Sequence, residues 1–289
     1  MTAGKPQTIF VAGATGKQGS AVTKSLLSKG FNVKALARNP VSAPAQVLEK
    51  LGAEIVTGDL NDPASFADHL KTADGLFCVL TFKNGVDIEI KQGFTLADLA
   101  RQYNVKHFLY SSVMAADLHT GIPHWESKFK IENHIKEIGL PYTIIRPTSL
   151  YENFLIPPLK KRILKGRFLS PIDKEVVQQF ISARDIGEIS AAVFMSRDKY
   201  LHKTVAIAAE QMNIGEVVNT FSRALGKEIT YQKIPGMIVR LVVGKTAFRI
   251  VKWANKNDST VVKDIAAFKQ EFPGLISLED WIRTNFISF

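Results

Sequence analysis

Short runs of Val, Ile, Leu and Phe alternate with stretches of helical spacing through the first half of the chain, and this alternation constrains the fold most strongly. The runs predict strands at 8–12, 32–36, 54–56, 75–80, 107–111 and 142–145, and the stretches between them predict helices at 20–29, 41–51, 63–70, 88–103 and 126–138. Strands joined through helices need crossover connections, which favour a parallel sheet. The strands carry runs of Val, Ile, Leu and Phe and no strict alternation of polar and apolar residues, as burial on both faces requires. The predicted fold class is therefore α/β, with a doubly wound parallel sheet.

Beyond Arg146 and Pro147 the alternation loosens. A strand is expected at 205–207, helices at 185–194 and 214–225, and mostly helical structure after residue 210. We find no internal repeat and no low-complexity linker that would separate an independent domain. We therefore expect a sheet domain at 1–150 and a smaller, mainly helical C-terminal lobe at 151–289 that packs on it. Open α/β sheets bind ligands at the carboxyl ends of their strands, so we expect the lobe to cover that edge.

The composition is that of a globular protein with an excess of basic residues. The 289 residues carry a net charge of +10 and one cysteine, Cys78, inside the apolar run 75–80. A single cysteine excludes an internal disulfide and a cysteine-based metal cluster, so we expect an inert thiol and no metal site. No segment has the length and apolarity to span a bilayer, and residues 1–6 hold no signal-peptide core. We expect a cytoplasmic protein with no membrane partner.

Two basic stretches contribute to the net charge. They lie at 160–167 and at 245–256, and the second places its basic residues on one helical face. Neither stretch is interleaved with a nucleic-acid-binding module, so we expect no direct nucleic-acid partner. Three interpretations stay open: solvated faces, a docking surface for an acidic partner, or a weak nuclear-import signal that would add a nuclear location.

Three glycines lie between the first predicted strand and the first predicted helix. The segment reads Gly13-Ala14-Thr15-Gly16-Lys17-Gln18-Gly19. Gly13 allows a tight turn off the strand, Gly16 lets a pyrophosphate approach the backbone, and Gly19 allows the helix to pack closely on the strand. The free N–H groups at the helix N-terminus then bind the diphosphate. This context predicts a dinucleotide site, and the domain at 1–150 is interpreted as an NAD(P)-binding Rossmann domain.

The charge after the second predicted strand indicates which dinucleotide binds. Arg38 stands where NAD-specific proteins hold an acidic residue on the ribose. An acidic side chain would repel a 2′-phosphate, whereas Arg binds it bidentately, and Lys17 adds a second positive charge. The pattern favours NADP(H) over the alternative that Arg38 is an ordinary surface arginine. Asp59, after the third strand, either accepts a hydrogen bond from the adenine amino group or shapes a turn.

The Gly-x-x-Gly-x-x-Gly spacing is typical of short-chain reductases, which place a Ser after the fifth strand and Tyr-x-x-x-Lys on the next helix. Here Ser111 and Ser112 end that strand and Lys128 is present, but His124 stands in place of the Tyr. His124 either acts as the general acid, since imidazole titrates near neutrality, or is a loop residue ahead of the helix. Lys128 is expected to contact the cofactor, with a surface ion pair to Glu132 as the alternative.

Together these features resemble the NmrA-like family, an atypical branch of the short-chain dehydrogenase/reductases. The resemblance runs along most of the chain. The matching segments are Gly13–Gly19, Arg38, Gly58-Asp59-Leu60, Lys91-Gln92-Gly93, 96–100, His124 with Lys128, Arg146-Pro147, Tyr151-Glu152-Asn153-Phe154, Asp185-Ile186-Gly187 and Leu278-Glu279-Asp280-Trp281.

The resemblance implies NADP(H) as the cofactor, with Lys91 facing it, Lys128 on the ribose, and Tyr151 and Asn153 near the nicotinamide. The candidate catalytic residues are Lys128 and His124. The full set of expected cofactor contacts is Gly13, Thr15, Gly16, Lys17, Gln18, Gly19, Arg38, Asp59, Leu60, Thr81, Phe82, Lys91, Lys128, Tyr151 and Asn153.

Two functions of different classes fit the resemblance. The first is an NADPH/NADP⁺ sensor, in which cofactor binding orders the loop at 82–86 and the C-terminal lobe and so changes the surface offered to a regulatory protein partner. The second is an NADPH-dependent reductase of quinones or other small electrophiles. Its pocket would be lined by the apolar residues at 154–156 and Phe168, which otherwise pack in the core. The missing tyrosine favours the sensor, as a monomer or dimer.

Overall fold

The structure, a computed structural model, describes residues 7–257 and 259–286, so the N-terminal segment for which we expect no signal-peptide core lies outside the described residues. The chain forms two compact units. The first comprises the residues up to Leu118 together with Pro123–Arg146 and Ile186–Val205, and the second comprises His119–Ile122, Pro147–Asp185 and the residues from Ala206 onward. The segment Ile186–Val205 thus belongs to the unit that contains the sheet. The boundary at residue 150 expected from the sequence places this segment in the C-terminal lobe.

A seven-stranded sheet organises the first unit, in the order β3-β2-β1-β4-β5-β6-β10. The pairings between β1 and β2, β1 and β4, β2 and β3, β4 and β5, and β5 and β6 are all parallel. The doubly wound sheet is therefore confirmed, and the strand order reverses between β1 and β4, where such sheets bind ligands. The strands are β1 Thr8–Ala12, β2 Asn32–Ala37, β3 Glu54–Thr57, β4 Gly75–Val79, β5 His107–Ser111, β6 Tyr142–Pro147 and β10 Lys203–Ile207.

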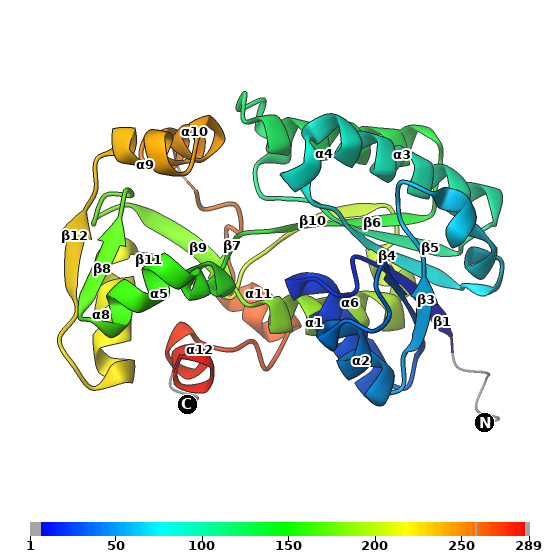
Figure 1. Cartoon of the computed structure of the whole chain (residues 1–289), viewed down its shortest axis with the longest axis horizontal. Coiled ribbons are helices and arrows are strands. Elements are labelled where there is room, and N and C mark those ends of the chain that lie inside the picture. The colour runs from blue at the N-terminus through cyan, green and yellow to red at the C-terminus, as the bar shows by residue number, and fades with distance from the viewer. Residues whose placement is uncertain (1–6, 258, 287–289) are drawn as a thin grey trace. The chain divides into compact units, whose positions relative to one another are not determined.

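Helices cover both faces of this sheet, with α3 and α4 on one face and α1, α2 and α6 on the other (Figure 1). On the second of these faces, Ser25 of α1 donates a hydrogen bond from Oγ to Glu188 of α6 at 2.8 Å. The core between the layers is almost wholly apolar, as in Phe10, Leu76 and Phe108, which are fully buried. The bounds are α1 Lys17–Ser28, α2 Ala43–Lys50, η3 Phe82–Asn84, α3 Val86–Gln102, η4 Ala116–Leu118, α4 Pro123–Glu137, α6 Ala183–Met195 and α7 Arg197–Tyr200.

The helix predicted at 63–70 is wrong in type. The segment forms two 3₁₀ helices, η1 Pro63–Ser65 and η2 Ala67–Thr72, with Phe66 between them. Phe66 takes a φ of −138°, outside the helical region, and its ring is buried against Phe10 with the centroids 5.9 Å apart. A contact with the sheet therefore interrupts the local helical spacing.

The second unit combines two small sheets with helices around an aromatic core. One sheet has the order β11-β9-β7, and the other pairs β12 with β8. Phe154 and Phe168 pack in this core, and Ile156 is exposed, so the core-packing interpretation applies to both Phe residues. The strands are β7 Ser149–Leu150, β8 Arg167–Ser170, β9 Val177–Ile181, β11 Glu210–Asn213 and β12 Thr230–Lys233.

Helices form much of the second unit after residue 210, as predicted. The predicted helix at 214–225 is α8, with the same bounds, and it begins with a capping box between Asn213 and Glu216. No helix in the described part of the chain is long and apolar enough to cross a membrane. The helices are η5 Tyr151–Leu155, α5 Pro157–Leu164, α8 Ile214–Leu225, α9 Gly236–Val242, α10 Lys245–Ala254, α11 Ile265–Glu271 and α12 Leu278–Asn285.

Candidate functional site

A glycine turn joins β1 to α1 at the point where the strand order reverses. Gly13 leaves the strand with a φ of +82°, and a Cβ at this position would lie 2.6 Å from the carbonyl oxygen of Val79. The backbone N–H of Gly16 donates to the carbonyl oxygen of Gly13 at 3.0 Å, and Gly16 is the N-cap of α1. The first position of the turn therefore requires glycine, for its backbone conformation and for its lack of a side chain.

Gly16 and Gly19 meet different surroundings. A Cβ on Gly19 would lie only 2.1 Å from the Gly13 carbonyl oxygen, so α1 rests directly on the turn. A Cβ on Gly16 would meet that oxygen at 3.2 Å and otherwise open space. Helix α1 has no side-chain cap and no acidic residue in its first turn. Its N-terminal N–H groups and its dipole are therefore oriented to bind an anion, and the turn fits a pyrophosphate group.

Arg38 follows β2, the neighbour of β1, and Asp59 follows β3, the next strand beyond β2. Because β1, β2 and β3 pair in parallel, their carboxyl ends lie along one edge with the glycine turn. Arg38 is exposed there, as is Lys17 of the turn. The Asp59 carboxylate accepts hydrogen bonds from the backbone N–H of Asn61 at 2.8 Å and from its side chain at 3.0 Å. Asp59 thus shapes a turn, and its contact with adenine stays a prediction.

The hydroxyl groups of Ser111 and Ser112 both donate hydrogen bonds to other side chains of the protein. Ser111 donates from Oγ to Gln18 Oε1 at 2.7 Å, which ties the end of β5 to the first turn of α1. Ser112 donates from Oγ to Glu132 Oε1 at 2.6 Å. Both serines are buried. These contacts connect the glycine turn and α4 to the end of β5, and they leave neither hydroxyl proton available for transfer.

Lys128 is buried, and its charge is paired across two helices. Its Nζ lies 3.0 Å from Glu89 Oε1 on α3, and it donates a hydrogen bond to the carbonyl oxygen of Leu80 at 3.4 Å. Ser127 donates from Oγ to the other Glu89 oxygen at 2.5 Å. The Lys128 ammonium also lies 5.6 Å from the ring centroid of Tyr110. The ammonium is thereby held just past the end of β4, beside the reversal in strand order.

The alternative interpretation of Lys128 as the surface partner of Glu132 is wrong. Glu132 is itself fully buried, and Arg146 Nη2 lies 2.6 Å from its Oε2. Lys128 and Glu132 are one helical turn apart on α4, but each pairs with a residue of another element. Lys128 pairs with Glu89 of α3, and Glu132 pairs with Arg146 of β6. Glu89, which the sequence reasoning did not single out, is therefore part of the candidate site.

His124 lies in the first turn of α4, because the helix begins at Pro123 and not at residue 126 as predicted. Proline suits the first position of a helix. The His124 ring stacks on Phe82, with the ring centroids 4.4 Å apart. Burial, and then the Lys128 charge, lower the pKa of His124 to about 4. The expectation that His124 titrates near neutrality is therefore wrong, since desolvation disfavours the charged imidazolium.

We expect the buried, neutral His124 to make stability depend on pH between about 4 and 6.5. The unfolded state binds a proton in this range and the folded state does not, so stability is full above about 6.5 and is lost as the pH falls. The difference in pKa corresponds to about 3 kcal/mol. In a His124→Gln variant, the drop in unfolding free energy between neutral pH and pH about 4 should shrink by that order. An NMR titration midpoint of His124 near 6.5 would contradict this account.

Cys78 is fully buried in β4, and burial raises the pKa of its thiol to about 12. A thiol with this pKa is protonated at neutral pH, which agrees with the inert interpretation. Within the described residues, no group of three or more His, Cys, Asp or Glu side chains is arranged to hold a metal ion.

Three further residues are expected near the cofactor because of the family resemblance, and each is described within its own unit. Lys91 is exposed on α3, and Asn153 is exposed on η5. Tyr151 is fully buried in the second unit and donates its hydroxyl hydrogen bond to Glu210 Oε2 at 2.9 Å. Contacts of these residues with a cofactor stay predictions.

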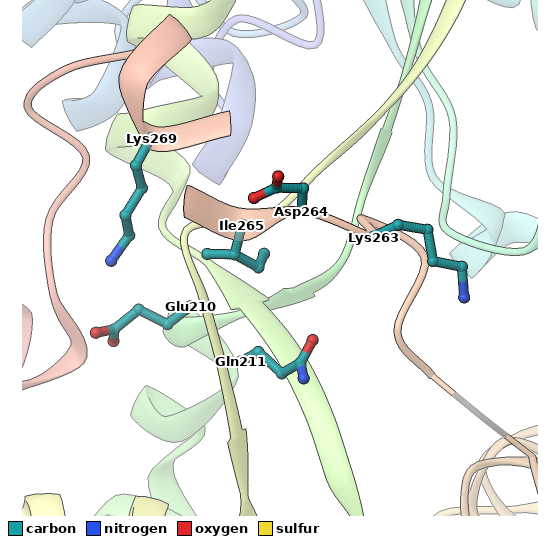
Figure 2. Close-up of a pocket in the computed structure, with 6 residues that line it drawn as sticks. All are labelled: Glu210, Gln211, Lys263, Asp264, Ile265 and Lys269. Atoms are coloured by element: carbon teal, nitrogen blue, oxygen red, sulfur yellow. The ribbon is translucent and has the colours of Figure 1, made fainter. Parts of the chain in front are cut away.

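The second unit contains a pocket of about 360 Å³ lined by none of the expected cofactor residues. Its wall includes Glu210, whose Oε2 also accepts a hydrogen bond from the backbone N–H of Leu278 at 2.6 Å. Glu210 therefore serves the packing of the second unit. Figure 2 shows the lining side chains, which are Glu210, Gln211, Lys263, Asp264, Ile265 and Lys269.

Comparison with known proteins identifies the family. The model of the NmrA-like family matches residues 5–272. The chain belongs to the NmrA-like family. It is 29% identical over 260 residues to an NmrA-like family domain-containing oxidoreductase of Malbranchea aurantiaca, a match that covers 80% of this chain and 76% of that protein. It is 27% identical over 248 residues to the nitrogen metabolite repression protein of Emericella nidulans, covering 81% of this chain and 70% of that protein.

The fold is also that of a solved NmrA-like protein. The crystal structure of NmrA, a negative transcriptional regulator in complex with NADP, matches with a TM-score of 0.80 at 21% identity, over 97% of this chain and 95% of that chain. At this identity the likeness shows the fold. Because NmrA-like relatives include both a regulator and an oxidoreductase, membership of the family leaves the activity to be argued from the site itself.

Proposed function

We propose that this NmrA-like chain binds NADP(H) at its glycine turn and acts as an NADPH/NADP⁺ sensor that regulates a protein partner. The observation that carries the proposal is the cradle at the start of α1, where Gly13 and Gly19 allow a turn that a Cβ would block and Gly16 leaves the backbone open. The NADP complex of the related NmrA structure supports the choice of cofactor.

The residues around the turn fit the parts of NADP(H). The α1 N-terminus would hold the pyrophosphate, Arg38 with Lys17 the 2′-phosphate, and Lys128 the ribose hydroxyls. When bound, NADPH supplies a hydride. The chain's own residues bind and orient the cofactor, and Glu89 keeps the Lys128 ammonium in place at 3.0 Å.

The groups near Lys128 favour a sensor because none of them offers a proton at neutral pH. His124 is uncharged, since its pKa is lowered to about 4 by burial and the Lys128 charge. Ser111 and Ser112 donate to Gln18 and Glu132. Burial raises the pKa of Tyr110 well above its ordinary value, so its hydroxyl is a poor acid.

A chain of contacts from Lys128 to the exposed loop at 82–86 further supports the proposal of a sensor. Lys128 contacts Glu89 in the first turn of α3, and the neighbouring His124 stacks on Phe82 in η3. The exposed loop at 82–86 lies between these two contacts. A ribose that draws Lys128 away from Glu89 would therefore shift the start of α3 and this loop when the cofactor binds, and a sensor requires in addition that the shift differ between NADP⁺ and NADPH.

The test is backbone hydrogen exchange of the loop at 82–86 without cofactor, with NADP⁺ and with NADPH. We expect the two cofactor forms to protect the loop to different extents, because a sensor must offer its partner a different surface in each state. Equal protection by NADP⁺ and NADPH, in protein that binds both, would count against a sensor.

A reductase is the second candidate function, favoured by the buried Lys128 and by the oxidoreductase among the relatives. Quinone reduction draws its proton from water as well as from a side chain, so it does not require the absent tyrosine. The assay is NADPH consumption with quinones, enones and aldehydes, for wild type and Lys128→Ala. Turnover that depends on Lys128 would replace the sensor with a reductase.

A further inference from the structure

Five large aliphatic side chains are exposed on α9 and just after it. Their exposed fractions run from 45% to 79%, and they are Met237, Ile238, Leu241, Val242 and Val243. The opposite side of α9 packs within the second unit: Val239 is buried, and a Cβ on Gly236 would lie 3.2 Å from the Phe248 ring of α10. Helices α9 and α10 therefore form a hairpin (Figure 1), and the exposed face of α9 is aliphatic. A contiguous exposed patch of this kind marks a surface for interaction.

The same hairpin carries uncompensated positive charge. From Gly236 to Asn257 the sequence contains five basic residues and no acidic residue. Arg240, Lys245 and Lys252 are exposed, and across the described residues no ion pair joins them to a carboxylate. Arg249 of α10 donates a hydrogen bond to the carbonyl oxygen of Gly121 at 3.2 Å. The hairpin therefore presents a positive field next to its aliphatic face.

We propose that the α9–α10 hairpin docks on an anionic lipid surface. Lys and Arg near such a surface are attracted by its negative potential, and aliphatic side chains enter the boundary between headgroups and acyl chains. Protein interfaces draw their central contacts mostly from Tyr, Trp and Arg, and their cores are depleted in Lys. Here the exposed apolar residues are all aliphatic, and Phe248 and Trp253 are half-buried. The chemistry of the hairpin thus fits lipid better than a protein partner.

This surface association differs from spanning a membrane. The sequence-based expectation of no membrane partner rests on the lack of a segment long enough to span. A helix that lies in the interface needs only an apolar face and basic flanks, which α9 and α10 supply. The proposal is independent of cofactor binding, because it uses none of the residues around the glycine turn.

The test is co-sedimentation of the full chain with vesicles of phosphatidylcholine alone or of phosphatidylcholine mixed with phosphatidylserine. We expect binding to the mixed vesicles and little to the neutral ones. Leu241→Asp with Val242→Asp should abolish binding, and the matched control Val41→Asp, at a residue 72% exposed in the first unit, should leave it unchanged. Lys245→Gln and Lys252→Gln should each weaken binding about fivefold. Circular dichroism confirms that these surface variants stay folded.

Three results would overturn the proposal. The first is equal binding to neutral and anionic vesicles, and the second is binding that survives the Leu241→Asp/Val242→Asp substitution. The third is a wild-type protein that fails to bind vesicles. If that protein dimerises in sedimentation equilibrium and the dimer is lost in the same variant, a second copy of the chain covers the aliphatic face.

Discussion

Replacing Arg146 with alanine is expected to lower the free energy of unfolding by about 3–5 kcal/mol, because it leaves a buried carboxylate without its hydrogen-bonded charge partner. Glu132 is fully buried, and Arg146 satisfies both of its oxygens, with Nε at 3.0 Å and Nη2 at 2.6 Å. Ser112 Oγ still donates to Glu132 after the substitution, but it brings no positive charge. Urea unfolding followed by far-ultraviolet circular dichroism measures the loss.

Two further variants separate the cost of an unpaired charge from the loss of packing. Lys136 Nζ lies 3.8 Å from Glu132 Oε2 and its side chain is 35% exposed, so Lys136→Ala should cost less than about 1 kcal/mol. Replacing both partners, with Glu132→Leu and Arg146→Met together, should recover much of the loss seen in Arg146→Ala. If Arg146→Ala and Lys136→Ala lower the free energy of unfolding equally, the buried pair of Glu132 and Arg146 does not contribute the stability expected of it.

Gly19→Ala is expected to abolish NADPH binding and to destabilise the first unit by about 1–3 kcal/mol, the usual cost of overpacking. The added Cβ would lie 2.1 Å from the Gly13 carbonyl oxygen and 2.6 Å from its carbon. These are backbone atoms and do not move aside as the end of a side chain does, so α1 must shift away from the turn. Fluorescence titration with NADPH and thermal unfolding report the two effects.

Gly16→Ala distinguishes a lost binding surface from a damaged fold. Its Cβ would meet only the Gly13 carbonyl oxygen, at 3.2 Å, a much milder clash than the 2.1 Å at Gly19, so it should lower the melting temperature far less than Gly19→Ala does. The methyl group would stand over the N-terminus of α1, and we expect NADPH affinity to fall about tenfold or more, equivalent to about 1.4 kcal/mol. Ser20→Ala, on the same helix, should change neither quantity. NADPH affinity that is unchanged in both Gly16→Ala and Gly19→Ala would show that the turn does not hold the cofactor.

The central sheet could be predicted because each of its first six strands contains a short apolar run, even where a polar residue such as Lys34 in β2 interrupts it. The bounds of β1 and β5 match the predicted strands at 8–12 and 107–111 to the residue. Strands such as β11 and β12 escaped prediction, because four residues with mixed polarity show no usable period. The predicted helix at 63–70 failed where Phe66 turns into the core, which is a tertiary contact and has no local signal.

The features of the candidate site that depend on local backbone geometry could be predicted from the sequence. The features that depend on the burial of side chains could not. The glycines of the turn can be recognised in the sequence by their spacing, because each position excludes a side chain for a local steric reason. Glu89 was missed because its partner Lys128 lies on another helix and only the fold brings them together. The pKa of His124 was misjudged for the same reason, since desolvation by the surrounding structure is absent from the sequence.

Cofactor binding is the claim on which the account depends, and its most direct test is titration of NADPH and NADH into wild-type protein and Arg38→Glu. We expect wild type to bind NADPH about tenfold to a hundredfold more tightly than NADH, because a hydrogen-bonded 2′-phosphate contributes on that scale. Arg38→Glu should remove this preference while it keeps NADH binding. Binding of neither dinucleotide, or a preference for NADPH that survives Arg38→Glu, would contradict the account.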